Sequence, residues 1–347
     1  MPDIHVRDFT PGDHEWARTL LADHGGGTHV MARLGELIDP LTLEGLVAEA
    51  DGRPVGLATV KETPERGLEV LTLHADPQGI GAGTALLETA WHVAAASGHH
   101  RLWLVTTNDN LDAIHFYLRR GMRVAAVHEN QVTRDRQELK PQIPEFNPDN
   151  GLPIRDLIEF ELPTAEGTEL ETQPFPRIED LDRLPMEAVA HELEPLFEGA
   201  PRFLRRLAEA RPFETDDGMI AKAFEIARGM PEEEQVELVE AHPRIGAPPA
   251  SVSEMSYREQ GYESEAEDDP DTARAYQELA MLNELYQRRF GFRYVVFVAG
   301  RPKTEIVPLL EHALRNDRAA ELRRAVDDTI YIAGDRLRTL RGLGMEG

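Results

Sequence analysis

A histidine and a carboxylate stand seventeen residues apart in the second half of the sequence, and both can carry acid–base chemistry. His242 precedes a proline, which restricts the backbone before it to extended conformations and so ends the preceding helical pattern. Glu259 belongs to the pattern Ser-x-x-Glu-Gln, from Ser256 to Gln260. A hydroxyl, a carboxylate and an amide can together bind a small polar substrate, and an imidazole titrates near neutral pH. The spacing predicts general acid–base chemistry by His242 and Glu259.

The same letters also have a structural interpretation. Ser-x-x-Glu is the capping box, in which a serine caps a helix and the glutamate bonds back to it. The pattern occurs a second time from Ser251 to Glu254. A single histidine before a proline is more often structural or exposed than catalytic. From the residues alone, both interpretations stay open for His242, Ser256 and Glu259.

A glycine-rich segment in the first half of the chain has the composition of an anion site. Residues 76–87 read Asp-Pro-Gln-Gly-Ile-Gly-Ala-Gly-Thr-Ala-Leu-Leu, which indicates a strand end, a turn and a helix start. Glycines let the backbone approach a diphosphate, whose charge meets free N–H groups at the helix start. A dinucleotide-binding domain uses similar letters, but an acidic residue then ends a strand about 20 residues later. Here that interval is a helix over Ala90–Ala96, which argues against such a domain.

The hydrophobic periodicity of the chain predicts the strands and helices that position these residues. The first half alternates strands and helices, with strands expected at Leu46–Glu49, Val55–Val60, Leu68–His74 and Arg101–Thr106 and a hairpin turn at Asp51-Gly52. From residue 180 the pattern is helical, and Phe290–Val298 is expected to be an extended connection or a short helix. Residues 164–175 lose all periodicity. We therefore predict two domains: a mixed α/β domain over residues 1–163, a linker over 164–175 and an all-α domain over 176–347.

Composition excludes several classes of function. The 347 residues include 63 acidic and 37 basic side chains, a net charge of −26 that would repel nucleic acid and anionic membrane surfaces. The chain has no cysteine, so disulfides and thiolate sites are excluded. None of the 13 histidines shows the spacing of a zinc site, and no apolar run is long enough to span a membrane. We expect a cytoplasmic protein without a metal, acting on small molecules.

The motifs of the second half occur in the order and spacing of one family. They are Phe203-Leu204, Arg211-Pro212-Phe213, His242-Pro243-Arg244-Ile245-Gly246, Ser256-x-x-Glu259-Gln260, Asn283-x-x-Tyr286, Phe290-Gly291-Phe292 and Ile332-Ala333-x-x-Arg336-Leu337. Residues 176 to about 342 thus resemble 2-oxo-4-hydroxy-4-carboxy-5-ureidoimidazoline (OHCU) decarboxylase, which yields S-allantoin after urate oxidation. The resemblance implies a cofactor-free carboxy-lyase with His242 and Glu259 as catalytic residues. It implies substrate contacts from Pro243, Ser256, Gln260, Phe290 and Arg336. We expect a homodimer.

The first half carries a second resemblance. Gln78-x-x-Gly81-x-Gly83, Asn110-x-x-Ala113-x-x-x-Tyr117 and Gly121-Met122 make residues 1–163 similar to the GNAT acyl-CoA N-acyltransferases, although the stretch at Pro77-Gln78 is shorter than usual there. The resemblance implies acetyl-CoA as co-substrate, bound by Leu73, Gln78, Gly79, Gly81, Gly83, Thr84 and Asn110. Tyr117 would protonate the departing thiolate. On spacing alone, Tyr117 also fits the buried face of its helix, and Glu69 could take a proton from the amine.

Different functions follow from the two resemblances. Both domains could be active, giving an OHCU decarboxylase with an N-acetyltransferase whose acceptor the sequence does not name. Alternatively, the N-terminal domain is a non-catalytic acyl-CoA-binding module with a regulatory or assembly role. A pair of inactive domains kept for protein contacts is the third possibility, and the complete set of polar motif residues argues against it.

Overall fold

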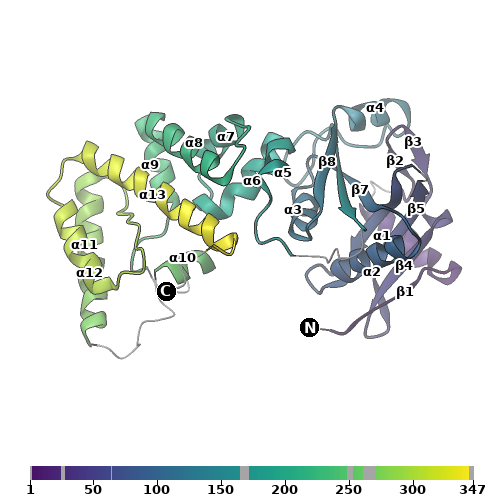
Figure 1. The fold of residues 1–347 in the computed structure, drawn as a ribbon, viewed down its shortest axis with the longest axis horizontal. Helices are drawn as coiled ribbons and strands as arrows, with labels where there is room; N and C mark the ends of the chain where they lie inside the picture. Colours follow the sequence, from purple (N-terminus) through teal and green to yellow (C-terminus); the bar gives the residue numbers. More distant parts are fainter. Residues whose placement is uncertain are drawn as a thin grey trace. The chain divides into compact units, whose positions relative to one another are not determined.

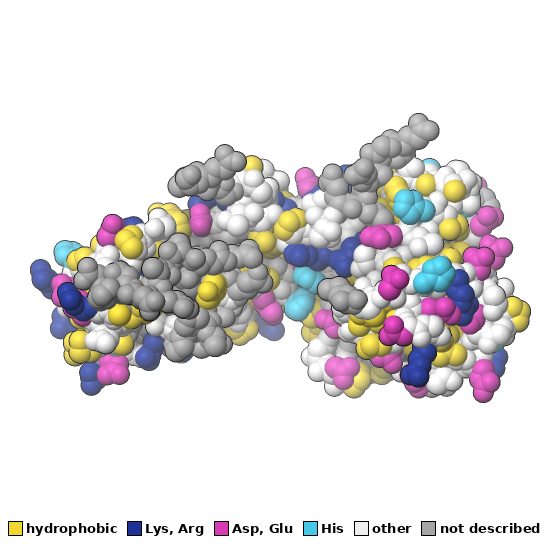
Figure 2. All heavy atoms as spheres, turned by 90° about the horizontal axis from the view of Figure 1, so that it is seen from below, with side chains coloured by type: hydrophobic (Ala, Val, Ile, Leu, Met, Phe, Trp, Pro, Cys, Tyr) yellow, Lys and Arg dark blue, Asp and Glu magenta, His cyan; other side chains and the backbone are white. Residues whose placement is uncertain are grey.

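The computed structural model describes residues 2–24, 28–63, 65–164, 172–247, 253–260 and 270–343. For His24, Glu254, Arg258, Glu259, Pro270 and Asp271 it describes the backbone and not the side chain. The chain divides into two compact units, residues 1–188 and 189–347 (Figure 1). Acidic and basic side chains are interspersed over the visible face of each unit (Figure 2).

The N-terminal unit is built on one mixed sheet of seven strands. The strands are β1 (Ile4–Asp8), β4 (Glu44–Ala50), β5 (Arg53–Thr63), β6 (Gly67–Ala75), β7 (Arg101–Thr107), β8 (Arg123–His128) and β9 (Leu157–Pro163). Their order is β1-β4-β5-β6-β7-β9-β8, and β6 and β7 are parallel while the other neighbours are antiparallel. A second, two-stranded sheet pairs β2 (Met31–Arg33) with β3 (Glu36–Ile38).

The hairpin predicted at Asp51-Gly52 is confirmed between β4 and β5. Asp51 has φ 51° and Gly52 has φ 72°. Two consecutive residues with positive φ give a turn whose twist matches that of the flanking strands. Glycine adopts this conformation without steric cost, and aspartate tolerates it better than most residues do.

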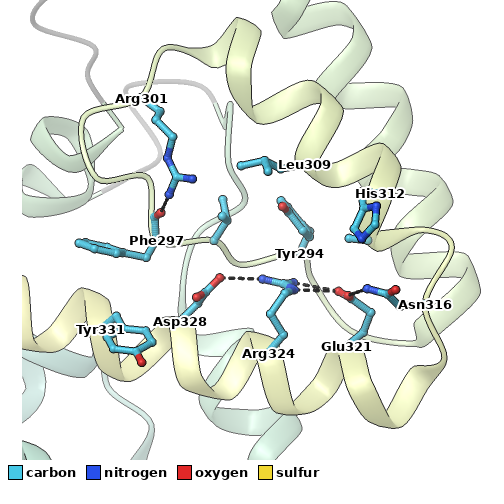
Figure 3. A pocket seen from close by; sticks show the side chains of 12 residues that line it. Tyr294, Phe297, Arg301, Leu309, His312, Asn316, Glu321, Arg324, Asp328 and Tyr331 are labelled. Carbon is cyan, nitrogen blue, oxygen red and sulfur yellow. Dashed lines mark hydrogen bonds and ion pairs between the residues drawn. The ribbon is translucent and has the colours of Figure 1, made fainter.

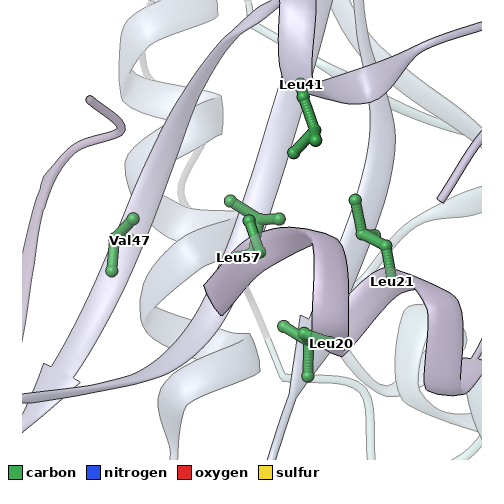
Figure 4. Close-up of a cluster of buried hydrophobic side chains, with 6 residues drawn as sticks. Leu20, Leu21, Leu41, Val47 and Leu57 are labelled. Atoms are coloured by element: carbon green, nitrogen blue, oxygen red, sulfur yellow. The ribbon is translucent and has the colours of Figure 1, made fainter. Parts of the chain in front are cut away.

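Helices cover both faces of the sheet, because successive strand residues point to opposite faces. Helix α2 (Ala82–Ala96) packs on the face where its Leu86 side chain reaches β5 at Gly56. Helix α1 (His14–His24) packs on the other face, where Leu20 and Leu21 join Val47 of β4 and Leu57 of β5 in one apolar cluster (Figure 4). The further helices of this unit are α3 (Leu111–Arg119), α4 (Gln131–Glu138) and α5 (Ile178–Arg183).

The segment after the sheet returns to it. In α5, the Asp180 carboxylate accepts a hydrogen bond from Val124 N on β8 (2.8 Å), and Arg183 Nη1 donates to Val124 O (2.7 Å). Strand β8 is the last in the sheet order, so these contacts satisfy polar groups on an edge strand. Helix α5 therefore belongs to the N-terminal unit, although the sequence places it in the second domain. Residues 165–171 of the expected linker lie outside the described part of the chain.

The described part of the C-terminal unit is helical, as predicted. After α6 (Met186–Phe197), which crosses the boundary between the units, the helices are α7 (Pro201–Glu209), α8 (Asp216–Gly229), α9 (Glu232–Ala241), α10 (Glu254–Glu259), α11 (Pro270–Phe290), α12 (Lys303–Ala313) and α13 (Arg318–Leu340). The chain after Phe290 runs to residue 299 without a helix or strand, so the extended connection is confirmed. Helix α13 begins after Asp317, whose side chain accepts a hydrogen bond from Ala320 N (2.8 Å).

The contact between α5 and β8 gives a stability prediction. Asp180→Ala should lower the free energy of unfolding of the N-terminal unit by about 1–3 kcal/mol, because the buried Val124 N–H would lose its acceptor. The three tryptophans, Trp16, Trp91 and Trp103, all lie in this unit, so their fluorescence during urea unfolding follows it alone. The exposed neighbour Glu179 provides the control, and equal midpoints for Asp180→Ala and Glu179→Ala would contradict the role given to α5.

Candidate active sites

His242 lies at the point where α9 ends. Its backbone is extended (φ −76°, ψ 144°), as the proline after it requires. The carbonyl oxygen of His242 accepts a hydrogen bond from Arg293 Nη1 (3.0 Å), which fixes the chain at this corner. The side chain is only 2% exposed, and neither ring nitrogen has a hydrogen-bond partner among the residues that the structure describes. A buried imidazole with no side-chain hydrogen-bond partner in the described structure is suited to exchange a proton with a ligand.

Two amide side chains hold the loop that follows His242. Gln260 Oε1 accepts a hydrogen bond from Gly246 N (2.9 Å), and Asn283 Nδ2 donates to Ile245 O (3.0 Å). Gly246 has φ 76°, a conformation that favours glycine. The structure thus gives Gln260, a predicted substrate-binding residue, a positioning contact with the loop.

Arg336 of α13 lies in the interior and connects segments that are distant in sequence. Its side chain is 2% exposed. Nη1 donates to the carbonyl oxygens of Pro195 (3.0 Å) and Leu196 (3.4 Å) near the C-terminal end of α6, where a positive charge is favourable. Nη2 donates to Glu198 Oε1 (2.8 Å) and to Ser256 Oγ (3.0 Å).

Glu198 is a member of this group that sequence reasoning missed. It follows α6 in a backbone conformation with φ 54°, which is uncommon for a residue with a side chain. Its Oε1 atom accepts hydrogen bonds from Ser253 Oγ (2.7 Å) and Ser256 Oγ (2.8 Å) in addition to the one from Arg336. The available sequence signal was a glutamate at the C-terminal end of a helix, where its charge opposes the helix dipole unless a cation compensates it.

Burial and charge set the protonation states of these groups. Burial, together with the nearby Arg336 charge, lowers the pKa of His242 to about 4, although Glu198 and the Leu238 backbone act in the opposite direction. Burial also opposes the charge on Glu198, but Arg336 and the two serine hydroxyls outweigh it and lower the pKa of this carboxyl. At neutral pH the site therefore combines a neutral imidazole with an ion pair between Arg336 and Glu198.

The other predicted residues of this site lie as follows. Pro243 is half-buried beside His242, and Ser256 is 2% exposed between Glu198 and Arg336. Glu259 is the last residue of α10, and its side chain lies outside the described structure. The Phe290 ring packs on Tyr286 in a buried aromatic cluster, with ring centroids 4.5 Å apart.

A separate cavity of about 450 Å³ lies between α12, α13 and the segment after Phe290 (Figure 3). Arg324 crosses its floor and forms ion pairs with Glu321 (2.9 Å) and Asp328 (2.7 Å). Aromatic side chains, including Tyr294 and Tyr331, contribute to the walls. None of the predicted site residues lines this cavity.

In the N-terminal unit, the glycine-rich segment joins β6 to α2 as predicted. Gly79 has φ 80°, and Gly81 has φ 95° and caps α2. A Cβ atom added at either position would meet no atom of the described structure within 4 Å, so the loop backbone is open to a ligand. The exposed Gln78 lies in this loop. Gly83 lies in the first turn of α2, where an added Cβ would contact the Phe116 ring at 3.6 Å.

A basic side chain that the sequence analysis did not single out lies beside this loop. Arg120 donates to Thr84 Oγ1 from both Nη2 (2.6 Å) and Nε (3.1 Å), and its guanidinium lies 4.8 Å from the centre of the Phe116 ring. Thr84 is a predicted cofactor-binding residue in the first turn of α2. A cation next to a helix N-terminus adds to the attraction for an anion.

The parallel strands β6 and β7 pair over only part of their length. Their register covers Leu68 with Leu102 and Glu69 with Trp103, near the start of each strand. The half-buried Leu73 lies beyond this paired part, on the way to the glycine loop. Polar groups on the β6 edge past Glu69 are therefore free of the ladder with β7 and could meet a ligand.

Asn110 and Tyr117 both have structural contacts in α3. Asn110 Oδ1 caps the helix by accepting a hydrogen bond from Ala113 N (3.2 Å). Tyr117 is 7% exposed and packs against Phe160 of β9, with ring centroids 5.6 Å apart; burial raises the pKa of its phenol. Glu69, a possible proton acceptor by its position, is 3% exposed and forms an ion pair with Arg33.

No group of three or more histidine, aspartate or glutamate side chains in the described residues is arranged to hold a metal ion. Of the helices that the structure describes, none has both the length and the apolar character needed to cross a membrane.

Comparisons with known proteins follow the division of the chain. An uncharacterised protein of Bacillus subtilis, YdhI, is 36% identical over 152 residues, which are 43% of this chain and 93% of that protein. The uric acid degradation bifunctional protein PucL of the same organism is 30% identical over 160 residues. The match is 46% of this chain but 32% of PucL, so this chain spans about a third of that relative. A 2-oxo-4-hydroxy-4-carboxy-5-ureidoimidazoline decarboxylase of Haloferax volcanii is 26% identical over 160 residues, 46% of this chain and 93% of that protein.

Two family models match, one in each part of the chain. The model described as acetyltransferase (GNAT) family matches residues 8–122, and the model described as OHCU decarboxylase matches residues 182–338. Residues 8–122 therefore belong to the GNAT acetyltransferase family and residues 182–338 to the OHCU decarboxylase family.

Proposed function

We propose that the C-terminal unit decarboxylates 2-oxo-4-hydroxy-4-carboxy-5-ureidoimidazoline to S-allantoin in urate catabolism. The observation that carries this proposal is the buried, neutral His242 imidazole beside the ion pair of Arg336 and Glu198. The match to the decarboxylase family supports it. A neutral imidazole in a dry site can take up and return a proton, which is the chemistry that this reaction needs from a protein.

The reaction breaks the bond between a ring carbon and its carboxylate. The electron pair of that bond moves toward the adjacent C=N bond of the imidazoline ring as CO₂ leaves, and the ring nitrogen takes up a proton. In the enol that results, the hydroxyl group loses its proton and becomes the carbonyl group of allantoin, while a proton adds to the neighbouring, ureido-bearing carbon. An electron sink within the substrate makes a cofactor unnecessary. The substrate carboxylate would bring a negative charge next to His242 and raise the pKa of its imidazole, so that the ring can hold the proton for this last step. Delivery of the proton to one face would set the S configuration.

The surrounding residues would orient the substrate. In this proposal Glu259 binds its hydroxyl or ureido N–H groups, and Ser256 and Pro243 complete the polar contacts around it. Arg336 keeps a positive charge at the polar end of the substrate, and Gln260 fixes the loop that carries His242. The substrate contact expected from Phe290 and the homodimer expected from the sequence stay predictions.

For the N-terminal unit we propose binding of acetyl-CoA and transfer of its acetyl group to an amine. The open backbone at Gly79 and Gly81 and the guanidinium of Arg120 support a diphosphate at the start of α2. Leu73, Gln78, Gly83, Thr84 and Asn110 would complete the cofactor site. Tyr117, whose phenol stays protonated at neutral pH, would supply the proton to the departing thiolate.

The contacts of Tyr117 and Asn110 are equally consistent with a second function for the N-terminal unit. Tyr117 is buried against Phe160 and Asn110 caps its helix, so both have a structural role without any catalysis. The N-terminal unit could then be a non-catalytic acyl-CoA-binding module. Binding of acetyl-CoA in calorimetry without turnover over a panel of amines would favour this function, and acetyl transfer to any amine would favour the first.

The decarboxylase proposal has a direct test. Protein is added to freshly generated ureidoimidazoline, and the decay of its absorbance is followed together with the circular dichroism of the allantoin that forms. We expect faster decay than without protein and an excess of the S enantiomer. An unchanged decay rate with racemic product would refute the proposal.

His242→Ala should lower kcat about 100-fold to 10,000-fold, as the loss of a general acid–base group typically does, while the helical circular dichroism stays near that of the wild type. Glu259→Gln tests the charge alone, because glutamine keeps the length and an acceptor oxygen of glutamate but is neutral. Glu259 ends α10 and Ser256 lies within that helix, so the two do not form a capping box, and full activity of Glu259→Gln would exclude the charge of Glu259 from the reaction. A stable, inactive variant that still binds allantoin would assign its carboxylate to the reaction.

Gly81→Asp should abolish acetyl-CoA binding in calorimetry, because its carboxylate would occupy the anion site at the start of α2. Gly98 is a matched control beyond the other end of this helix: it also has positive φ (76°, against 95° for Gly81), and an added Cβ there also meets no atom of the described structure within 4 Å. Both substitutions impose similar backbone strain, so Gly98→Asp should keep the affinity. Equal acetyl-CoA affinities in the two variants would contradict binding of the diphosphate at this loop.

The protonation of His242 should also make stability depend on pH. Its folded pKa of about 4 lies below the ordinary value of 6.5, so the unfolded chain binds more protons between these values. The stability that the neutral ring contributes is complete above pH 6.5 and is lost as the pH falls toward 4. Urea unfolding followed by far-UV circular dichroism should show a shallower loss over this range in His242→Gln than in wild type. The exposed His312, changed to glutamine, is the control, and parallel curves for all three proteins would contradict the burial of His242.

A further inference from the structure

We propose that Glu198 is a positioning residue of the decarboxylase site, whose carboxylate holds the Arg336 guanidinium and the hydroxyls of Ser253 and Ser256, at the start of α10 and within it, in place beside His242. This inference rests on the function proposed for the C-terminal unit. It assigns a role to a residue outside the motifs that identified the site, and it depends on the geometry of three elements that meet at one oxygen atom.

Glu198 Oε1 accepts three hydrogen bonds. Arg336 Nη2 (2.8 Å) comes from α13, while Ser256 Oγ (2.8 Å) and Ser253 Oγ (2.7 Å) come from α10 and the residue just before it. Arg336 Nη2 also donates to Ser256 Oγ (3.0 Å), so glutamate, arginine and serine form a closed ring of contacts. Because α10 ends at Glu259, fixing Ser253 before the helix and Ser256 within it also fixes the backbone position of Glu259.

The left-handed backbone conformation of Glu198 indicates that a glutamate side chain is required at this position. With φ 54° it occupies the left-handed region, which costs a residue with a Cβ atom about 1–2 kcal/mol relative to glycine. Glycine would fit the turn better and would not place a negative charge at the end of α6. Strained residues of this kind cluster at functional sites, where the surrounding structure holds them.

The charges around His242 determine how Glu198 affects protonation of the imidazole. Arg336 of α13 disfavours the protonated ring and Glu198 favours it, while Arg293 binds the His242 carbonyl oxygen and forms an ion pair with Glu240 of α9. The Glu259 side chain, on α10, lies outside the described structure. Without Glu198 the positive charge of Arg336 would act on His242 uncompensated, and protonation of the ring would become harder.

The test compares Glu198→Gln with Glu194→Gln. Both variants lose one negative charge near the end of α6, but the Glu194 side chain is 54% exposed and binds none of the site residues. Glu198→Gln keeps an acceptor oxygen and loses the charge, so we expect kcat to fall roughly tenfold to a hundredfold, the equivalent of one hydrogen bond to a charged group. We expect KM to change less, and the acid limb of the kcat/KM profile to move to lower pH. Glu194→Gln should match the wild type in both respects.

Wild-type kcat and pH profile in Glu198→Gln would overturn the proposal, as would an equal loss in Glu194→Gln. If Glu198→Gln does not fold, Glu198→Gly replaces it, because glycine relieves the left-handed backbone and opens room for a small anion. Restoration of its lost activity by added formate would support the role of the carboxylate, and no restoration would overturn it. Absence of activity in the wild type would instead refute the function proposed for the unit.

Discussion

The packing of the C-terminal unit depends on one buried guanidinium group, whose charge and N–H groups need partners within the protein. Arg336 is removed from water, and the desolvation of a charge costs several kcal/mol unless hydrogen bonds and an opposite charge compensate it. Here the compensation comes from carbonyl groups at the end of α6, from the Glu198 carboxylate and from the Ser256 hydroxyl. Since these groups lie on different elements, satisfying one side chain brings α6, α10 and α13 together.

The same burial gives the neighbouring histidine its chemical character. An exposed imidazole is partly protonated near neutral pH, whereas the low polarity around His242 and the charge of Arg336 keep its ring neutral. The lowered pKa of Glu198 keeps a negative charge in the same region. Two titratable groups whose environments favour different charge states are the usual arrangement for acid–base chemistry. An entering anion would change the balance in favour of the protonated ring.

The ligand sites proposed for the two units are built in different ways. The site proposed in the N-terminal unit consists of backbone N–H groups at Gly79, Gly81 and the start of α2, where no Cβ atoms occupy the space that a diphosphate would need. The C-terminal unit instead places ionised side chains in its interior and fixes them through one another. A site made of backbone groups depends on local chain conformation and can therefore be recognised as a motif in the sequence. A side-chain site depends on long-range packing.

That difference separates what the sequence determined from what the tertiary structure decided. The hairpin at Asp51-Gly52, the extended backbone at His242 and the cap of α13 at Asp317 follow from residues adjacent in the chain, and all were predictable. The segment that includes α5 looks like the start of a helical domain in the sequence, yet its hydrogen bonds go to the edge strand β8.

The site shows the same division. The residue types at His242, Ser256 and Arg336 were readable from motif order, but the link from Arg336 to Glu198 joins residues 138 positions apart. The contacts of Arg120 with Thr84 and of Gln260 with Gly246 also join distant positions. Local sequence fixes conformation because neighbouring atoms restrict φ and ψ. Which distant charge compensates a buried one is decided only when the folded chain removes both from water.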